Sequence, residues 1–212
     1  VRQIKAQLTE DGRLQVRAKT IYGCLQQDDL QMLINSLSKD KVKEVLQEKL
    51  DFATYEVDRF NYKEHKSKRP SVEEELDISV SNYATITGKR LFIVPNIMTR
   101  HGRRLTQQEE RKYPLELDVE YRDTDSVEIV IPAGYTAESV PTDVVLETRF
   151  GKYRSTVKID GNRILYFRTM EHFAGNFAAK EYAELVKFYE AMYKADRARL
   201  VLVKSESTPK SF

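Results

Sequence analysis

Cys24 has the greatest potential for chemistry in this sequence, because it is the only cysteine and a thiolate is a strong nucleophile. Cysteine catalysis needs a base within hydrogen-bond reach and a third group that orients the base. The three histidines, His65, His101 and His172, lie in polar or charged surroundings far from Cys24 in sequence. Cys24 also follows Tyr22-Gly23 at the end of a predicted strand. We therefore expect a small apolar residue that fills space, not a nucleophile.

Metal binding and acid–base catalysis have equally little support. The histidines have none of the spacings that are typical of zinc sites. Carboxylates are adjacent at Glu73-Glu74-Glu75 and at Glu109-Glu110. Sequence neighbours point in different directions on a helix or a strand, so we expect solvated charges there. The eight glycines are scattered and form no phosphate-binding loop. We expect no catalytic, cofactor-binding or metal-binding residue, no cofactor, and a chain that is not itself an enzyme.

Two basic clusters could in principle bind nucleic acid. The first contains Lys63, His65, Lys66, Lys68 and Arg69 beside Tyr62, and the second contains Arg100, His101, Arg103 and Arg104. Basic residues near an aromatic ring are typical of single-stranded nucleic-acid sites. However, glutamates flank both clusters, and the net charge of the chain is only +2. We expect two solvated loops and no nucleic-acid partner. Contact with an acidic face of a neighbouring domain is the intermediate alternative.

The composition is that of a soluble globular protein. Of the 212 residues, 41% are hydrophobic and 32% are charged. No apolar run approaches the roughly 20 residues that a membrane-spanning helix needs. The lone cysteine excludes an internal disulfide. The chain starts at Val1, without Met and without the pattern of a signal peptide, so we expect a piece of a longer protein.

The first half alternates between strand and helix patterns. Residues 1–22 predict a hairpin around the turn-forming Asp11-Gly12. Apolar residues at helical spacing predict helices over 28–37 and 40–50, with Ser38 as the N-cap of the second helix. Extended segments are predicted at 52–60, 76–80 and 91–94, with a polar loop over 61–71.

The second half begins with a charged stretch, 99–112, where Thr106-Gln107-Gln108-Glu109 matches a capping box and could start a short helix. Alternation then predicts strands at 115–121, 127–131, 144–150, 153–159, 164–168 and 200–203. The clearest helix spans 178–195. We expect it to bury an apolar stripe against a sheet, namely Tyr182, Leu185, Val186, Tyr189 and Met192. Its water-facing residues are expected to be Lys180, Glu184, Lys187 and Lys194.

Together these elements predict an α+β fold dominated by mostly antiparallel, sandwich-like sheets, with about three helices including a C-terminal amphipathic helix. We expect an N-terminal β-rich subdomain with two helices over residues 1–98. A C-terminal antiparallel β subdomain with the terminal helix should cover 99–204, followed by a polar tail over 205–212.

Several short strand and turn motifs, in a fixed order, resemble those of one known family. They are Ser81-Asn82-Tyr83-Ala84 with Gly88, Leu91–Pro95, Tyr113-Pro114, Ile131–Tyr135, Phe150–Tyr153, Glu181-Tyr182 with Phe188-Tyr189, and Lys194–Arg197. In these motifs the chain resembles the C-terminal region of bacterial transglutaminase-like proteins, a domain of unknown function that follows a transglutaminase core. The resemblance covers residues 80–204 well and residues 1–80 more loosely.

This resemblance has consequences for partners and location. It implies that a transglutaminase or papain-like core, with its catalytic Cys, His and Asp, lies upstream of Val1. None of those residues can be assigned to this sequence, because no motif here matches that core. The resemblance also implies that the partners are neighbouring domains of the same polypeptide, and that the protein is periplasmic or in the cell envelope.

We therefore expect a non-catalytic accessory module that packs against the catalytic core or positions it. The alternative is a glycan- or peptide-binding module that uses a tyrosine-rich sheet face. The exposure of six tyrosines distinguishes the two, since a binding platform would place several of them on one exposed face. They are Tyr22, Tyr62, Tyr83, Tyr121, Tyr135 and Tyr153.

Overall fold

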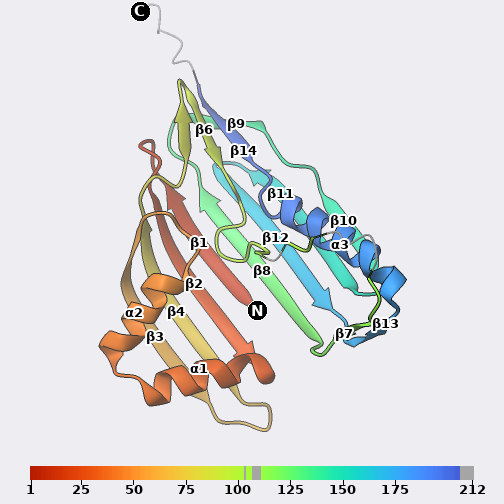
Figure 1. Ribbon diagram of the computed structural model, residues 1–212. Helices are drawn as coiled ribbons and strands as arrows, with labels where there is room; N and C mark the ends of the chain where they lie inside the picture. Colours follow the sequence, from red (N-terminus) through yellow and green to blue (C-terminus); the bar gives the residue numbers. More distant parts are fainter. Residues whose placement is uncertain (103, 107–110, 206–212) are drawn as a thin grey trace, which may run out of the picture.

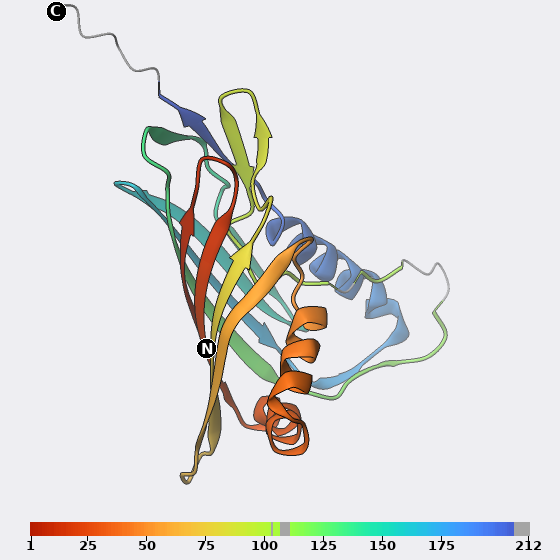
Figure 2. The ribbon, with the colours of Figure 1, turned by 90° about the vertical axis from the view of Figure 1, so that its left-hand side faces the viewer.

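The computed structural model describes residues 1–102, 104–106 and 111–205. Its centre is an eight-stranded sheet in the order β10-β11-β12-β8-β1-β2-β4-β3 (Figure 1). Figure 2 views this sheet nearly edge-on and shows the three α-helices on the same side of it. Among the strand pairings of the described residues, only that between β1 and β8 is parallel. The predicted α+β class with mostly antiparallel sheets is confirmed.

The N-terminal elements are two hairpins separated by two helices. Their bounds are β1 Arg2–Leu8, β2 Leu14–Gly23, α1 Leu25–Ser36, α2 Lys39–Lys49, β3 Tyr55–His65 and β4 Ser71–Val80. Ser38 caps α2 as predicted, since its side chain accepts a hydrogen bond from the Lys41 backbone N–H. The loop predicted over 61–71 is wrong for residues 61–65, which pair with β4. These polar residues belong to an edge strand, where solvent can reach charged side chains.

The C-terminal elements complete the large sheet and add one long helix. Their bounds are β8 Tyr121–Val130, β10 Val144–Thr148, β11 Gly151–Asp160, β12 Arg163–His172, the 3₁₀ turn η1 Ala179–Glu181 and α3 Tyr182–Ala195. The single strand predicted at 115–121 is wrong, because β7 ends at Leu117 and β8 begins at Tyr121. The helix that the capping box at Thr106 predicted lies outside the described residues.

Two small sheets complete the fold. Four short strands form the first, in the order β5-β6-β14-β9, namely Thr85–Thr87, Arg90–Ile93, Leu200–Lys204 and Tyr135–Ser139. The second pairs β13 (Gly175–Phe177) with β7 (Leu115–Leu117). Leu91, Ile93 and Leu202 of the four-stranded sheet share one hydrophobic cluster with the large sheet. The four-stranded sheet therefore covers part of the face on which the helices also lie.

Helix α3 packs as its apolar stripe predicted. Tyr182, Leu185, Val186, Tyr189 and Met192 are all buried, in a second cluster that includes Phe150, Tyr153 and Met170 of the large sheet and its β10–β11 turn. We also expected the strands before and after this helix to lie in one sheet, and that is wrong. β12 belongs to the eight-stranded sheet and β14 to the four-stranded sheet, because β14 pairs with β6 and β9.

The large sheet crosses the boundary predicted between residues 98 and 99. β1 of the first part pairs with β8 of the second part along residues 2–7 and 125–130. The α3 cluster, in contrast, draws all its members from residues 105–195. The division into two folding units stays a prediction.

Candidate interaction surface

Cys24 lies at the N-cap of α1 and is exposed, so the prediction that it fills space in the interior is wrong. The chain leaves β2 here with a left-handed backbone, φ +54°, and turns outward into the helix. No hydrogen bond joins Cys24 to a histidine within residues 1–102, 104–106 and 111–205. The base that a cysteine nucleophile needs is not in place beside it.

The three histidines contact other parts of the protein and lie apart from Cys24. His172 is buried, and its Nδ1 donates to the carbonyl oxygen of Val119 at 2.7 Å, while its Nε2 is 3.2 Å from the Tyr189 hydroxyl. The His101 ring lies 4.8 Å from the ring of the same tyrosine. His65 pairs with Glu73 on the far side of the sheet. In the part of the chain that the structure describes, no group of three or more potential ligands could hold a metal ion.

The glutamates at 73–75 divide between the two faces of β4. Glu73 and Glu75 face solvent beside Lys19, whose Nζ lies 2.7 Å and 3.5 Å from their carboxylates. Glu74 points the other way and is only 5% exposed, so the expectation of a solvated charge is wrong for this residue. The hydroxyls of Tyr22 and Tyr62 donate to its two oxygens at 3.0 Å and 2.9 Å. The side-chain period of two in a strand accounts for the division.

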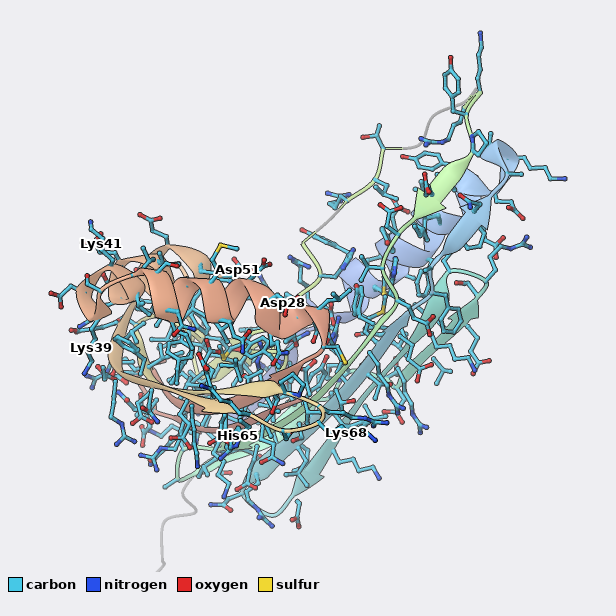
Figure 3. All side chains as sticks on the ribbon, turned by 90° about the horizontal axis from the view of Figure 1, so that it is seen from below. Asp28, Lys39, Lys41, Asp51, His65 and Lys68 are labelled. Carbon is cyan, nitrogen blue, oxygen red and sulfur yellow. The ribbon has the colours of Figure 1, made fainter. Side chains whose placement is uncertain are left out.

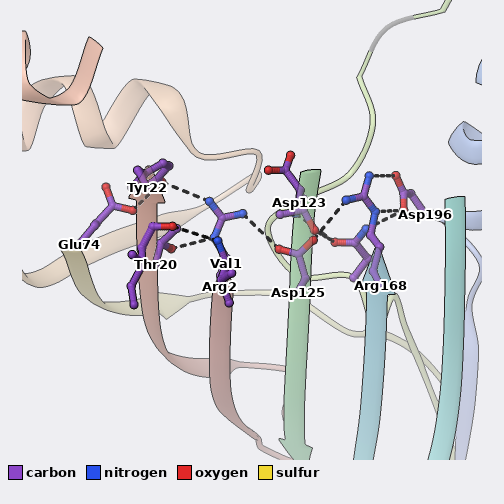
Figure 4. Close-up of polar contacts among 12 residues, drawn as sticks. Val1, Arg2, Thr20, Tyr22, Glu74, Asp123, Asp125, Arg168 and Asp196 are labelled. Carbon is purple, nitrogen blue, oxygen red and sulfur yellow. Dashed lines mark hydrogen bonds and ion pairs between the residues drawn. The ribbon is translucent and has the colours of Figure 1, made fainter. Parts of the chain in front are cut away.

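Glu74 belongs to a continuous polar belt on the helix-bearing face of the sheet, most of which is labelled in Figure 4. The belt comprises Tyr62, Glu74, Tyr22, Thr20, Arg2, Asp125, Arg168, Tyr153 and Asp196. Arg2 donates to Thr20 at 2.9 Å and to Tyr22 at 3.2 Å, and lies 3.7 Å from Asp125. The belt therefore links seven neighbouring strands of the sheet, from β3 to β11.

Arg168 and Asp196 are the most buried ion pair of the belt. Arg168 also donates to Asp125 at 3.2 Å. Asp196, just after α3, accepts from the Tyr153 hydroxyl at 2.8 Å, from Asn96 at 2.9 Å and from the His101 backbone at 2.8 Å. These contacts satisfy a carboxylate that is fully removed from water.

Burial and neighbouring charges together shift the pKa values of the belt residues. Burial raises the pKa of Asp125, although Arg168 and Arg2 oppose the shift. Burial and the nearby Glu74 carboxylate raise the pKa of Tyr22 to about 12. Burial lowers the pKa of Arg168, but the charges of Asp196 and Asp125 outweigh it and raise that pKa above its ordinary value. Because its charges are paired and enclosed, the belt fixes strand positions.

The sequence contains a signal for this belt that the strand analysis did not use. Asp125 is in phase with the buried Val127 and Ile129 of β8, and Arg168 is in phase with Ile164 and Tyr166 of β12. A charged residue at an apolar position of an alternating strand indicates a buried, paired charge.

The two basic clusters do not form a common surface. Figure 3 shows His65 and Lys68 at the hairpin of β3 and β4, apart from Asp28, Lys39 and Lys41 of the helix pair and from Asp51, which follows α2. In the second cluster, the Arg100 guanidinium donates to the Asp51 carbonyl oxygen at 2.5 Å, and that of Arg104 lies 5.1 Å from the Tyr193 ring centre. Arg103 lies outside the described residues. Arg100 and Arg104 thus each contact another part of the protein, although Arg104 is exposed.

The face of the large sheet opposite the helices is uncovered, and we call it the open face. Two rows of side chains cross it from β11 to β3, and in each row the successive residues lie directly opposite one another on neighbouring strands. They are Thr156, Phe167, Ser126, Gln3, Lys19, Glu75 and Asn61, and Lys158, Leu165, Glu128, Lys5, Arg17, Asp77 and Arg59. The half formed by β2, β4 and β3 carries paired charges: Arg17 and Arg59 lie 2.9 Å and 3.0 Å from Asp77.

The other half of the open face contains a hollow of about 570 Å³. Leu165 and Phe167 of β12, the strand between β11 and β8, line it, and Phe167 is 41% exposed. Its cationic side chains are Lys5, Arg154 and Lys158, and its anionic side chains are Glu128 and Asp143. An apolar floor with polar groups around it is typical of binding surfaces.

The tyrosines do not form an exposed platform. Of the six that distinguish the two expected functions, Tyr153 is buried and the other five are half-buried. The hydroxyls of Tyr22, Tyr62 and Tyr153 are engaged in the polar belt. This arrangement gives little support to a tyrosine-based glycan site. Among the described helices, none is both long and apolar enough to cross a membrane.

Comparison with known proteins identifies a family. A family model described as "Domain of Unknown Function with solved-structure structure (DUF3858)" matches residues 89–202. No curated protein matches this sequence. A crystal structure from Parabacteroides distasonis ATCC 8503, described as a "putative protease", is similar over 46% of this chain and 19% of that chain, with 21% identity and a TM-score of 0.40. The similar region is thus less than two thirds of that protein.

Proposed function

We propose, from the premise that this chain belongs to the DUF3858 family of domains of unknown function, that it is a non-catalytic accessory module of a larger transglutaminase-like protein. In this proposal the module packs against the catalytic core of the same polypeptide and positions it. The transglutaminase-like parent, and an exported, envelope setting for it, come from the resemblance of the motifs between residues 80 and 204.

One observation carries this proposal: the helices and the four-stranded sheet cover one face of the large sheet and leave the other uncovered. An antiparallel sheet can expose one face to water when that face is polar. Here Leu165 and the 41% exposed Phe167 interrupt the polar rows of the open face. Exposed apolar groups rimmed by charges are typical of a surface that packs against another domain.

The proposal is tested by Phe167→Glu in the parent protein. A charge at the centre of the contact should uncouple this domain from the core. A single coupled unfolding transition in calorimetry is then expected to split, or the transition of this domain to move to lower temperature. Met32→Glu is the matched control, because Met32 is 68% exposed on α1, on the helix side of the sheet.

The same two substitutions in the isolated 212-residue chain complete the test. Both residues are exposed, so neither change should lower the stability of the isolated chain appreciably. If Phe167→Glu leaves unfolding of the parent unchanged, the open face does not dock the core. If it destabilises the isolated chain to the same extent as the parent, its effect is on folding.

A further inference from the structure

The edge of the large sheet is incomplete beside the hollow. β10 pairs with β11 only from Val144 opposite Ser155 to Thr148 opposite Gly151. β11 continues to Asp160, and residues 156–160 pair with β12 on one side. On the other side, no backbone hydrogen bond joins residues 156–160 to the rest of the described chain. Such a row of unpaired N–H and C=O groups is a template for an added strand.

Along this free edge, polar side chains point to one face of the sheet and apolar side chains point to the other. Thr156 and Lys158 point to the open face and line the hollow. Val157 is half-buried against the main core, and Ile159 is 38% exposed on the other face. A strand added here would place alternate side chains at the rim of the hollow, beside Thr156 and Lys158, and the remaining ones beside Val157 and Ile159. The edge therefore selects a segment in which two kinds of residue alternate.

The charges at the hollow indicate which residues the added segment would place on that face. Lys5, Arg154 and Lys158 have no hydrogen-bond or ion-pair partner among residues 1–102, 104–106 and 111–205. Of the two carboxylates there, Glu128 lies 3.7 Å from Arg163, whereas Asp143 has no described partner. The cations of the β2–β4–β3 half, in contrast, are largely paired. An acidic segment is the complement of the surplus positive charge.

The geometry disfavours a second copy of this chain at the same edge. If residues 156–160 paired with themselves in antiparallel register about their centre, Lys158 would face Lys158. Like charges directly opposite one another destabilise a strand pair. The other edge of the sheet, β3, has a bulge between Val57 and Arg59 and several charged side chains, which are features of a protected edge.

We propose that residues 156–160 of β11 receive an extended segment with alternating acidic and apolar residues. Its acidic side chains lie at the β11 rim of the hollow, near Lys158 and Arg154, and its apolar side chains contact Val157 and Ile159. Main-chain hydrogen bonds to a sheet edge supply affinity, and alternate side chains supply specificity. The inference deepens the proposed function, on which it rests for the source of the segment: the neighbouring catalytic domain.

The test measures binding of a capped, fluorescent peptide of alternating glutamate and valine to the 212-residue chain by fluorescence anisotropy. An isomer with the glutamates grouped at one end keeps composition and charge but breaks the alternation. Two further peptides carry N-methyl groups on alternate amides, along one edge or along the other. We expect the grouped isomer to bind at least about tenfold more weakly, and only one N-methylated peptide to lose binding.

Variants of the chain locate the site. Lys158→Glu is expected to weaken binding of the alternating peptide at least about tenfold. Lys187→Glu, at an exposed position of α3, is expected to leave binding of that peptide unchanged. The inference would be overturned by equal binding of the alternating and grouped peptides or by equal binding of the two N-methylated peptides. Unchanged binding of the alternating peptide to the Lys158→Glu variant would also overturn it. So would the absence of binding.

This test can fail independently of the proposed function. If the peptide does not bind but Phe167→Glu uncouples the parent protein, only the strand-addition inference is wrong. If the peptide binds as expected but the parent is unaffected by Phe167→Glu, the segment is recognised without docking of the core, and the proposed function is wrong.

Discussion

Arg168 of β12 and Asp196, the residue after α3, form a buried ion pair in which Nε lies 2.9 Å from Oδ1. Their side chains are 5% and 0% exposed. The pair joins the end of the helix to the middle of the large sheet, and Asp125 adds a second carboxylate to the same guanidinium. Arg168 therefore links the C-terminal end of α3 to two strands of the sheet.

Arg168→Met should destabilise the chain strongly. It leaves Asp125 and Asp196 buried without their cation, and breaking a buried pair from one side typically costs about 3–5 kcal/mol. Urea unfolding measures the loss. Arg163→Ala on the same strand is the control, since this arginine is 43% exposed and its loss should cost less than about 1 kcal/mol. Equal losses would mean that the belt does not hold the fold.

Removal of the hydroxyl should change stability differently at two tyrosines on adjacent strands, Tyr153 and Tyr166. The Tyr153 hydroxyl donates to Asp196 at 2.8 Å, and Tyr153→Phe should cost about 1.5–3 kcal/mol, as expected for a hydrogen bond to a charged group. The Tyr166 hydroxyl is buried with no hydrogen-bond partner in the described chain. Tyr166→Phe should therefore leave stability unchanged or raise it by about 1 kcal/mol.

The comparison is made in parallel urea titrations of the two variants, which have the same change in composition. Wild-type unfolding is the common reference. A loss for Tyr166→Phe as large as that for Tyr153→Phe would show that its hydroxyl has a partner, such as a bound water.

The charges of the open face should affect acid stability. Asp77 accepts a hydrogen bond from Arg17 at 2.9 Å, and this bond, with the charges of Arg17 and Arg59, holds the pKa of Asp77 below its ordinary 3.8. The folded-state pKa lies below the unfolded value, so the contribution to stability is present above pH 3.8 and is lost as pH falls through the folded pKa.

Arg17→Ala should therefore raise the pKa of Asp77 and reduce the loss of stability on acidification. Titration of the Asp77 carboxyl by NMR from about pH 2 to pH 6 measures this. Lys5→Ala is the control, because Lys5 lies opposite Arg17 in the register but has no ion pair with a described residue. An unchanged Asp77 titration in Arg17→Ala would contradict the assignment.

Local patterns were sufficient to predict much of the fold. Alternation predicted the strand that carries the buried Leu76, Ile78 and Val80, and the apolar stripe of α3 predicted its buried residues. These patterns depend only on the period of a strand or helix. Strand order is different, because the pairing of β1 with β8 joins residues more than one hundred positions apart, as in Arg2 opposite Asp125.

The site was harder to predict for the same reason. The polar belt joins Arg2 to Asp196, and the free edge of β11 exists because β10 begins only at Val144, opposite Ser155. Neither follows from a local motif. Cys24 shows a related limit: its exposure is determined by an outward turn with φ +54°, which residue type alone did not predict.

Leu185 should be among the residues on which the stability of the α3 cluster depends most. It is 3% exposed and lies among Tyr182, Tyr189 and other members of the cluster. Truncation of a buried leucine typically costs about 2–5 kcal/mol, from lost transfer free energy and the cavity left behind. Leu185→Ala should therefore lower the urea midpoint clearly.

Lys187→Ala is the matched control, since Lys187 is on the same helix and exposed. Surface substitutions of this kind usually change stability by less than about 0.5 kcal/mol. Both variants contain the same alanine, which removes any difference in the helix propensity of the new residue. Equal midpoints would mean that the stripe contributes little to the core. In that case the apolar face of α3, and not the open face of the sheet, would be the first candidate for contact with a neighbouring domain.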